Sequence, residues 1–212
     1  MTFSIIARDP TTGAFGVATA TGGPAVGQLV PHARAGMGAL ATQGFTNPLY
    51  AYDGLAALEA GRSAQEIVAE LTGADSGRER RQLIVIDATG KSAGWTGGEL
   101  EGSCAMVLET GFAVAGNLLS NDQVVPAMAA AFDALSGRLE DRLLAAMEAG
   151  HAAGGDSRGI LSAALKTYTD QLYPAIDVRV DFSDTPLSDL SRTLDRVRTG
   201  GYADFFAQLP RR

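Results

Sequence analysis

Thr2 is the residue whose type and position could do chemistry by itself. Methionine aminopeptidases remove an initiator Met that precedes a small residue, and loss of Met1 would give Thr2 a free α-amino group beside its hydroxyl. An unperturbed α-amino group has a pKa of about 7.7–8, so near neutral pH part of it is unprotonated and can accept the hydroxyl proton. Thr2 would then hold nucleophile and base on one residue. The alternative is that Thr2 is only the polar first residue of a β-strand.

The rest of the sequence lacks conventional catalytic and cofactor motifs. Residues 22–27 are glycine-rich, but no Gly-Lys-Ser/Thr follows, so we expect no phosphate-binding loop. A Gly-x-Ser-x-Gly elbow is missing, and neither His32 nor His151 has an HExxH or CxxC companion, so we expect no zinc site. Cys104, the single cysteine, is expected to be a small buried apolar side chain rather than a nucleophile. The sequence therefore predicts no metal and no cofactor.

The composition is typical of one packed globular domain. The chain has 212 residues, of which 46% are apolar and 19% charged, which is enough for one sizeable core and wrong for disorder. The net charge is −7 without a Lys/Arg cluster, so nucleic acid is not an expected partner. No apolar run approaches the ~20 residues of a transmembrane helix, and no basic-then-apolar leader opens the sequence. We expect a cytoplasmic protein with no membrane partner.

Four strands are predicted in the first 44 residues. Residues 3–8 and 14–20 are β-rich, and the Pro- and Gly-containing turn at 9–13 between them predicts a hairpin. Residues 28–35 and 37–44 form a second apolar pair that is broken at Gly36, and Pro31 indicates an edge or irregular position.

After these strands the apolar spacing becomes helical. Residues 47–60 predict a helix ending at Gly61, and Ser63-Ala64-Gln65-Glu66 is a capping-box pattern for a second helix ending at Gly73. A second capping-box pattern at 120–123 predicts a helix to Leu135. The further predicted elements are strands at 81–96 (as a hairpin), 104–109, 112–116, 160–168 and 175–182, a helix at 139–151 that ends at Gly154-Gly155, and a helical tail at 186–209 interrupted at Gly200-Gly201.

The order of these elements favours one architecture. Strands come mainly as hairpins and helices mainly as pairs, which is not the order of βαβ units. Two antiparallel sheets packed face to face, each covered by a helix pair, account for this order. We therefore predict an α+β fold, a four-layer αββα sandwich, as a single domain over residues 1–212 with 186–212 as a C-terminal helical extension. Because such sandwiches often associate through their helices, we expect a homo-oligomer, a dimer or higher.

Several spaced motifs resemble those of a known family. In chain order they are TFSIIARDPTTGAFGVA (2–18), VPHARAGMGALATQG (30–44), GN (116–117) and AGGDSRG (153–159). They are similar to the landmarks of the uncharacterised family called domain of unknown function 1028, which is grouped with the N-terminal-nucleophile (Ntn) hydrolases. The resemblance spans about residues 2–182. It implies the αββα fold, in agreement with the order of elements.

The resemblance implies a catalytic role for Thr2 and two candidate donors to an oxyanion. Thr2 stands where Ntn hydrolases keep the nucleophile, at the tip of the first strand, with its own amine as base. The backbone N–H of Gly44 would stabilise the oxyanion, since glycine lets substrate approach closely; a plain turn is the alternative. The side-chain amide of Asn117 would donate to the same oxyanion or to substrate; a loop or cap role is its alternative.

Charged groups complete the implied site. Asp156 would orient the N-terminal amine, with a helix cap or turn as the alternative. Arg34 lies near the place of a lysine in proteasome-like relatives, and a guanidinium fits an electrostatic role or a clamp on a substrate carboxylate. A solvated side chain or a structural ion pair is its alternative. Gln43 and Arg158 are further candidates for substrate binding.

One departure from the proteasome-like pattern concerns the second strand. An Asp follows that strand in those relatives, whereas this chain has Thr19-Ala20-Thr21. Either Asp9, Asp156 or an unseen partner takes its place, or the activity differs in kind.

Together, these features predict an Ntn-type hydrolase. Its substrate would be a small molecule with an amide-like C–N bond other than a peptide bond. The alternatives are a small-molecule-binding protein that retains the fold without chemistry, and a structural or assembly subunit.

Overall fold

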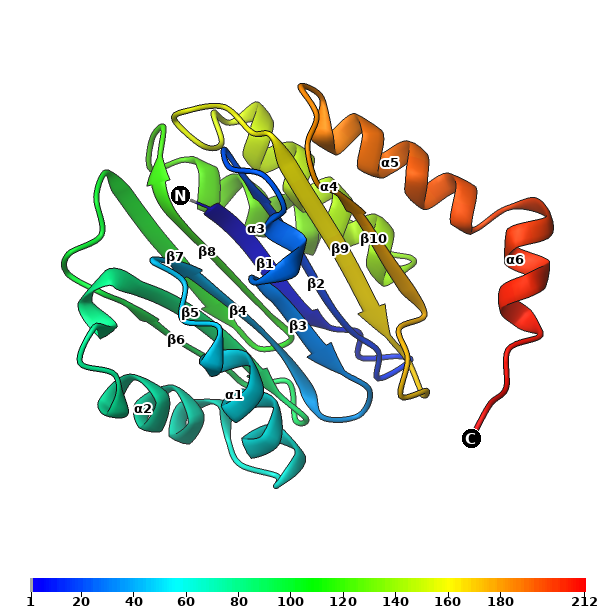
Figure 1. Ribbon diagram of the computed structural model, residues 1–212, viewed down its shortest axis with the longest axis horizontal. Helices are drawn as coiled ribbons and strands as arrows, with labels where there is room; N and C mark the ends of the chain where they lie inside the picture. The colour runs from blue at the N-terminus through cyan, green and yellow to red at the C-terminus, as the bar shows by residue number, and fades with distance from the viewer. Residues whose placement is uncertain (1) are drawn as a thin grey trace.

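Two antiparallel sheets lie face to face in the computed structural model, which describes residues 2–212 (Figure 1). From edge to edge, the larger sheet consists of β10 (Ile176–Val180), β9 (Ser162–Tyr168), β2 (Phe15–Thr21), β1 (Thr2–Arg8), β8 (Phe112–Leu119) and β7 (Ser103–Glu109). The smaller sheet consists of β3 (Pro31–Arg34), β4 (Gly38–Gly44), β5 (Arg81–Asp87) and β6 (Ser92–Thr96). The strand β1 is therefore central in the larger sheet, between β2 and β8.

Helices cover the outer face of each sheet, which confirms the predicted αββα sandwich (Figure 1). The smaller sheet is covered by α1 (Leu49–Glu59) and α2 (Ala64–Ala74), and the larger sheet by α3 (Val124–Ala134), α4 (Leu139–Ala152) and α5 (Pro186–Val197). The final helix α6 (Gly200–Ala207) buries no residue of its own. Short 3-10 helices occupy Val26–Gln28 and Arg78–Arg80.

The alternation of side chains along β1 shows how the layers form. Phe3, Ile5 and Ala7 belong to the core under the outer helices, whereas Ile6 faces the other sheet. Residues two apart in a strand share a face, so one strand supplies two cores. The core between the sheets contains Ile6, Phe15, Val17, Val26, Val30, Ala33, Ala39, Ala41, Ile84, Ile86, Ala113 and Ala115. Full burial of a side chain such as Ile84 contributes about 1.5–3 kcal/mol to folding.

Most predicted elements agree with the structure, and the differences have local causes. The strand predicted at 28–35 begins at Pro31, because the residues before it form a 3-10 helix. The helix predicted to end at Gly73 continues to Ala74, and the break in the tail falls before Gly200, which begins α6.

The two capping-box patterns have different outcomes. Ser63 forms the box: its Oγ accepts from the Glu66 N–H, and the Glu66 carboxylate accepts from the Ser63 N–H. The box predicted at 120–123 is wrong. There, Asn121 Oδ1 accepts the Gln123 N–H at 2.8 Å, and α3 begins at Val124 without a side-chain cap.

Within residues 2–212, none of the helices has the length and apolar character that a membrane span requires.

Candidate active site

The layer between the sheets changes from apolar to polar toward the start of β1. Ile6 lies in the apolar core, and the residues that precede it on the same face, Ser4 and Thr2, are polar and buried. Four neighbouring strands make the same change: Thr19 and Thr21 follow Val17 on β2, Gln43 follows Ala41 on β4, Gln82 precedes Ile84 on β5, and Asn117 follows Ala115 on β8. Because residues two apart share a face, the polar side chains collect at one end of the layer.

Hydrogen bonds across the two sheets hold the backbone of Thr2. Gln43 on β4 donates its Nε2 to the Thr2 carbonyl oxygen at 3.2 Å and to Gln82 Oε1 at 2.6 Å. Its Oε1 accepts from Ser4 Oγ at 2.6 Å. Buried polar groups that satisfy one another in this way fix a single arrangement. The position of Thr2 is therefore set by the smaller sheet as well as by its own.

The Thr2 side chain lies beside β2 and is nearly covered. Its Oγ1 lies 3.3 Å from Thr21 Oγ1, and the residue is 5% exposed. Thr21 is the last residue of β2, so the hydroxyl of Thr2 lies where that strand ends.

An acidic side chain reaches the end of β2 from a distant part of the chain. Asp156 Oδ2 accepts the N–H of Gly22, the residue after Thr21, at 2.6 Å. The same carboxylate forms an ion pair with Arg158 Nη2 at 3.2 Å and accepts the Arg158 N–H at 2.8 Å. A Cβ on Gly22 would lie 2.8 Å from the Gly159 carbonyl oxygen, so this close approach requires glycine. Asp156 thus occupies the vicinity in which the sequence lacks an acid.

Asp9, the other acidic candidate for that place, lies at the opposite end of β1. It follows Arg8, and its Oδ1 accepts the N–H groups of Thr11 and Thr12 at 2.9 and 2.8 Å. Burial alone would raise the pKa of the Asp9 carboxyl, but these turn hydrogen bonds lower it overall. Asp9 is therefore a turn residue.

A cavity of about 330 Å³ opens beside the polar end of the layer. It is lined by Gly44, Phe45, Glu99, Leu100, Glu101, Asn117, Leu118 and Arg158. Two of these residues have left-handed backbone conformations, Gly44 with φ +82° and Leu118 with φ +50°. For a leucine this conformation costs about 1–2 kcal/mol, and such strain tends to cluster at functional sites. The strained residue directly follows Asn117.

The structure brings most of the predicted site residues together. Thr2 and Asn117 are paired across β1 and β8, and Gln43 bonds to Thr2. Gly44 and Arg158 share the cavity with Asn117, and Asp156 holds Arg158. Gln43, however, is buried and both ends of its amide bind protein groups, so it contacts β1 rather than the cavity.

Arg34 is not part of this group. It pairs with Gly38 at the other end of β4, roughly 20 Å along the strand from Gly44. Its guanidinium forms a 2.9 Å ion pair with Glu59 on α1, and both side chains are exposed. Arg34 lies there because it is the last residue of β3, directly before the turn to β4, and this turn is at the end of the smaller sheet remote from Thr2. Arg34 therefore forms a structural ion pair, which was one of the alternatives to a role in the site.

Gln82 and Ser4 are site residues that sequence reasoning missed. Gln82 Oε1 accepts from Gln43 and from Asn117 Nδ2, and its Nε2 donates to the Gly116 carbonyl at 3.0 Å. The available signal was a polar residue on the inward face of an otherwise apolar strand, at Gln82 in RQLIVID and at Ser4 in TFSIIAR. No group of three or more His, Cys, Asp or Glu side chains within residues 2–212 is placed to hold a metal ion.

Comparisons with known proteins place the chain in a family. A similar solved structure is that of protein SPO2555 from Silicibacter pomeroyi, which is 36% identical with a TM-score of 0.93 over 99% of this chain and 95% of that one. Anbu, an ancestral beta-subunit from Yersinia bercovieri, is 16% identical with a TM-score of 0.44 over 98% of each chain. No curated protein matches. The family model that matches residues 2–190 is that of a family of unknown function, DUF1028, and the chain belongs to this family.

Proposed function

We propose that the chain is an Ntn-type hydrolase that cleaves an amide-like bond of a small molecule, with Thr2 as the nucleophile after removal of Met1. The observation that carries this proposal is the position of Thr2, at the end of the inter-sheet layer where the inward residues of five strands change from apolar to polar. Thr2 is paired there with Asn117, which lines the cavity. A strand start without function would not need a buried polar network held across two sheets.

The chemistry needs one residue for two tasks. The α-amine of Thr2 takes the proton from Oγ1 as the oxygen attacks the substrate carbonyl, and the tetrahedral intermediate forms. The resulting ammonium gives its proton to the leaving nitrogen, the C–N bond breaks, and an ester to Thr2 remains. Water, deprotonated by the same amine, then attacks the ester and releases the acid and the Thr2 hydroxyl. No metal or cofactor is required.

Groups at the cavity support these steps. The Gly44 N–H is proposed as an oxyanion donor, because Gly44 lines the cavity and has no side chain there. Asp156 is proposed to support the positive charge of the amine from the end of β2.

Arg158 is proposed to bind an anionic group of the substrate. Its side chain lines the cavity and is 51% exposed, and its ion pair with Asp156 leaves other guanidinium N–H groups for a ligand. Hydrolysis assays that compare matched anionic and neutral amides test this role, and we expect faster turnover of the anionic members.

The test of the proposed function begins with the N-terminus. Intact-protein mass spectrometry should show a chain that begins at Thr2. Labelling with an electrophilic lactone should then modify Thr2, and Thr2→Val should abolish it, because valine keeps the β-branched shape and removes the hydroxyl. A chain with one extra residue before Thr2 keeps the hydroxyl but converts the amine to an amide. Its labelling rate should fall at least about 100-fold, since a positioned base contributes that much.

Thr11→Val is the matched control. Thr11 is exposed in the turn between β1 and β2, so labelling should be unchanged. Retention of Met1 in the purified protein, or undiminished labelling of Thr2→Val, would contradict the proposed nucleophile. Ligand binding without turnover in the natural chain that begins at Thr2 would instead favour a non-catalytic binding protein.

A further inference from the structure

The orientation of the Asn117 side-chain amide is determined by its neighbours. Carbonyl oxygens only accept hydrogen bonds, so the Gln43 atom next to the Thr2 carbonyl and the Gln82 atom next to the Gly116 carbonyl are both donating nitrogens. Gln82 therefore presents its oxygen to Asn117. Asn117 therefore directs its Nδ2 toward Gln82 and donates to Gln82 Oε1 at 3.0 Å.

This orientation leaves Asn117 Oδ1 as a buried acceptor without a hydrogen-bond partner among the described residues. Asn117 is 1% exposed, and Oδ1 itself has almost no contact with solvent. A buried carbonyl oxygen without a donor is unfavourable and uncommon in native proteins. A donor that forms only in the mature protein would account for it.

The N-terminus of the mature chain is the donor in the right place. Thr2 and Asn117 are directly paired across β1 and β8. Asn117 bonds to Gln82 of the smaller sheet, and Thr2 is on the same face of β1 as Ser4, which bonds to Gln43 of that sheet. Paired residues have Cα atoms about 4.5–5.5 Å apart, which puts the backbone nitrogen of Thr2 within reach of an Asn side chain. Asn117 lines the cavity, but its Oδ1 has almost no exposed surface, so a substrate in the cavity is a poorer candidate for the donor.

We propose that Asn117 Oδ1 accepts a hydrogen bond from the α-amino group of Thr2 and so orients the catalytic base. This inference rests on the proposed function, and it makes Asn117 a positioning residue for the amine rather than a donor to the oxyanion. The acceptor stabilises the ammonium that forms when the amine takes the proton from Oγ1. It therefore raises the pKa of the amine.

The test measures this pKa without using activity. Competitive acetylation with acetic anhydride across pH, read by mass spectrometry of the N-terminal peptide, reports the amine pKa in a Thr2→Val chain that lacks the nucleophile. In that background, Asn117→Leu should lower the amine pKa by about one unit, since a hydrogen bond to a charged group is lost. Asn117→Asp, of the same size, should raise it because a carboxylate favours the ammonium more strongly.

Thr11→Val is the control, because Thr11 is exposed in the turn at the far end of β1 and contacts no group of the buried network. It should leave the amine pKa unchanged. Charged groups around the site, namely Asp156, Arg158, Glu99 and Glu101, are the same in all variants.

An amine pKa that moves in neither Asn117 variant would overturn the inference, and Asn117→Asp decides alone if Asn117→Leu does not fold. The two proposals can fail separately. A shifted amine pKa in the Thr2→Val chain together with persistent lactone labelling would keep the hydrogen bond and reject the nucleophile. Retained Met1 would contradict both.

Discussion

Gly44 shows how a single backbone conformation leaves room for the cavity. Its φ of +82° is one that residues with a Cβ rarely adopt, and a Cβ there would lie 2.7 Å from the Arg80 carbonyl oxygen and 2.8 Å from Leu100 Cδ2. Gly36, in the turn between β3 and β4, has a similar φ of +70°, but a Cβ there would meet nothing within 4 Å. Alanine substitutions at the two positions therefore distinguish the effect of backbone strain, which both have, from that of a steric clash, which only Gly44 has.

We expect Gly44→Ala to destabilise the protein more than Gly36→Ala. In both variants an alanine must adopt the left-handed conformation, which lowers the free energy of unfolding by about 1–2 kcal/mol. Only Gly44→Ala adds a steric clash, for which we expect a further loss of at least about 1 kcal/mol. Urea denaturation followed by circular dichroism measures both. Equal losses in the two variants would mean that the cavity wall yields easily.

Whether a capping-box pattern in the sequence forms a cap depends on the neighbouring hydrogen-bonding groups. The Ser-x-x-Glu pattern at Ser63 forms its capping box, whereas the similar pattern at Ser120 does not. Asn121 competes there by bonding to the Gln123 N–H, and the Ser120 N–H donates to the Gly155 carbonyl at 3.1 Å. The residues before α3 are therefore tied to the end of α4 rather than to their own helix.

Ser63→Ala should lower the free energy of unfolding by about 1 kcal/mol, because the N–H of Glu66 loses its acceptor at the start of α2. Ser120→Ala should change it by less than about 0.5 kcal/mol, since this side chain caps no helix. Thermal and urea denaturation of the pair test the difference. A loss of similar size at Ser120 would show that the hydrogen bond from Asn121 Nδ2 to Ser120 Oγ matters more than the missing cap.

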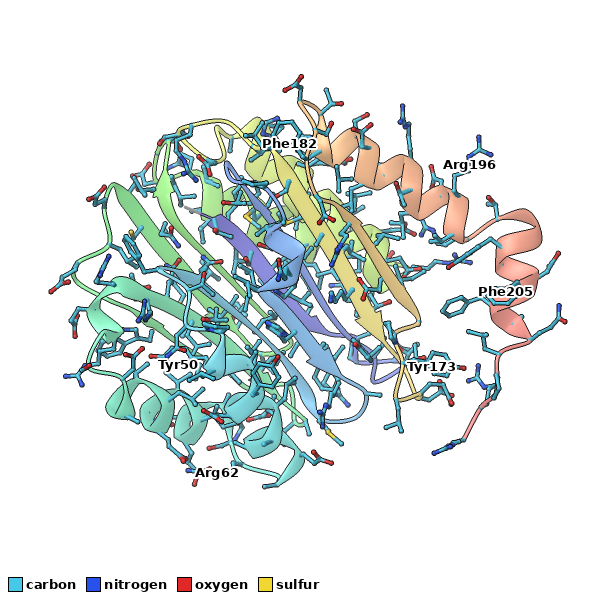
Figure 2. The ribbon with its side chains drawn as sticks, viewed as in Figure 1. Tyr50, Arg62, Tyr173, Phe182, Arg196 and Phe205 are labelled. Carbon is cyan, nitrogen blue, oxygen red and sulfur yellow. The ribbon has the colours of Figure 1, made fainter. Side chains whose placement is uncertain are left out.

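At the scale of the whole molecule, Asp75 joins the outer helices to the smaller sheet. Its Oδ2 accepts from Asn47 Nδ2 at 3.1 Å, from the Tyr50 hydroxyl at 2.9 Å and from Arg81 Nε at 3.1 Å. Tyr50 lies on α1 (Figure 2), Asp75 follows α2, and Arg81 begins β5. Burial alone would raise the pKa of Asp75, but hydrogen bonds from the Gly77 N–H and from these side chains lower it to about 2.

Acid should therefore weaken this junction in a defined pH range. The folded pKa lies below the ordinary value of 3.8, so the carboxylate contributes stability above pH 3.8 and loses it as pH falls toward 2. Asp75→Asn should lower the free energy of unfolding by about 2 kcal/mol at pH 7 and by much less at pH 2. Asp53→Asn, on the exposed face of α1, should leave this pH dependence unchanged. Parallel stability curves for Asp75→Asn and the natural protein between pH 6 and 2 would contradict the role of Asp75.

The last helix, α6, raises a separate question about assembly. Tyr202 and Phe205 on α6 are exposed, and Figure 2 shows Phe205 at the edge of the molecule. The expected homo-oligomer, like the cytoplasmic location, stays a prediction. Light scattering of the purified chain measures its state of assembly.

The sequence by itself determined the layers, the family and the candidate nucleophile. Alternation with period two is written locally in each strand, so FSIIAR already assigns Phe3 and Ile5 to one face and Ile6 to the other. The pairing of hairpins with helix pairs then favours the αββα sandwich, and the spaced motifs pointed to the family that the comparison confirms.

Only the tertiary structure decided which ends of the strands meet. Register between strands far apart in the chain depends on packing over whole sheets, and no local pattern states it. The packing of the two sheets puts the turn between β3 and β4, and Arg34 with it, at the end remote from Thr2. The tertiary structure also brings Asp156 to Gly22, 134 residues away. The contact with Gln82 determines the orientation of the Asn117 amide: Nδ2 donates to Gln82 Oε1, and Oδ1 remains as an acceptor beside Thr2. The residue types suggested a site, but the pairing of distant strands determined which residues form it.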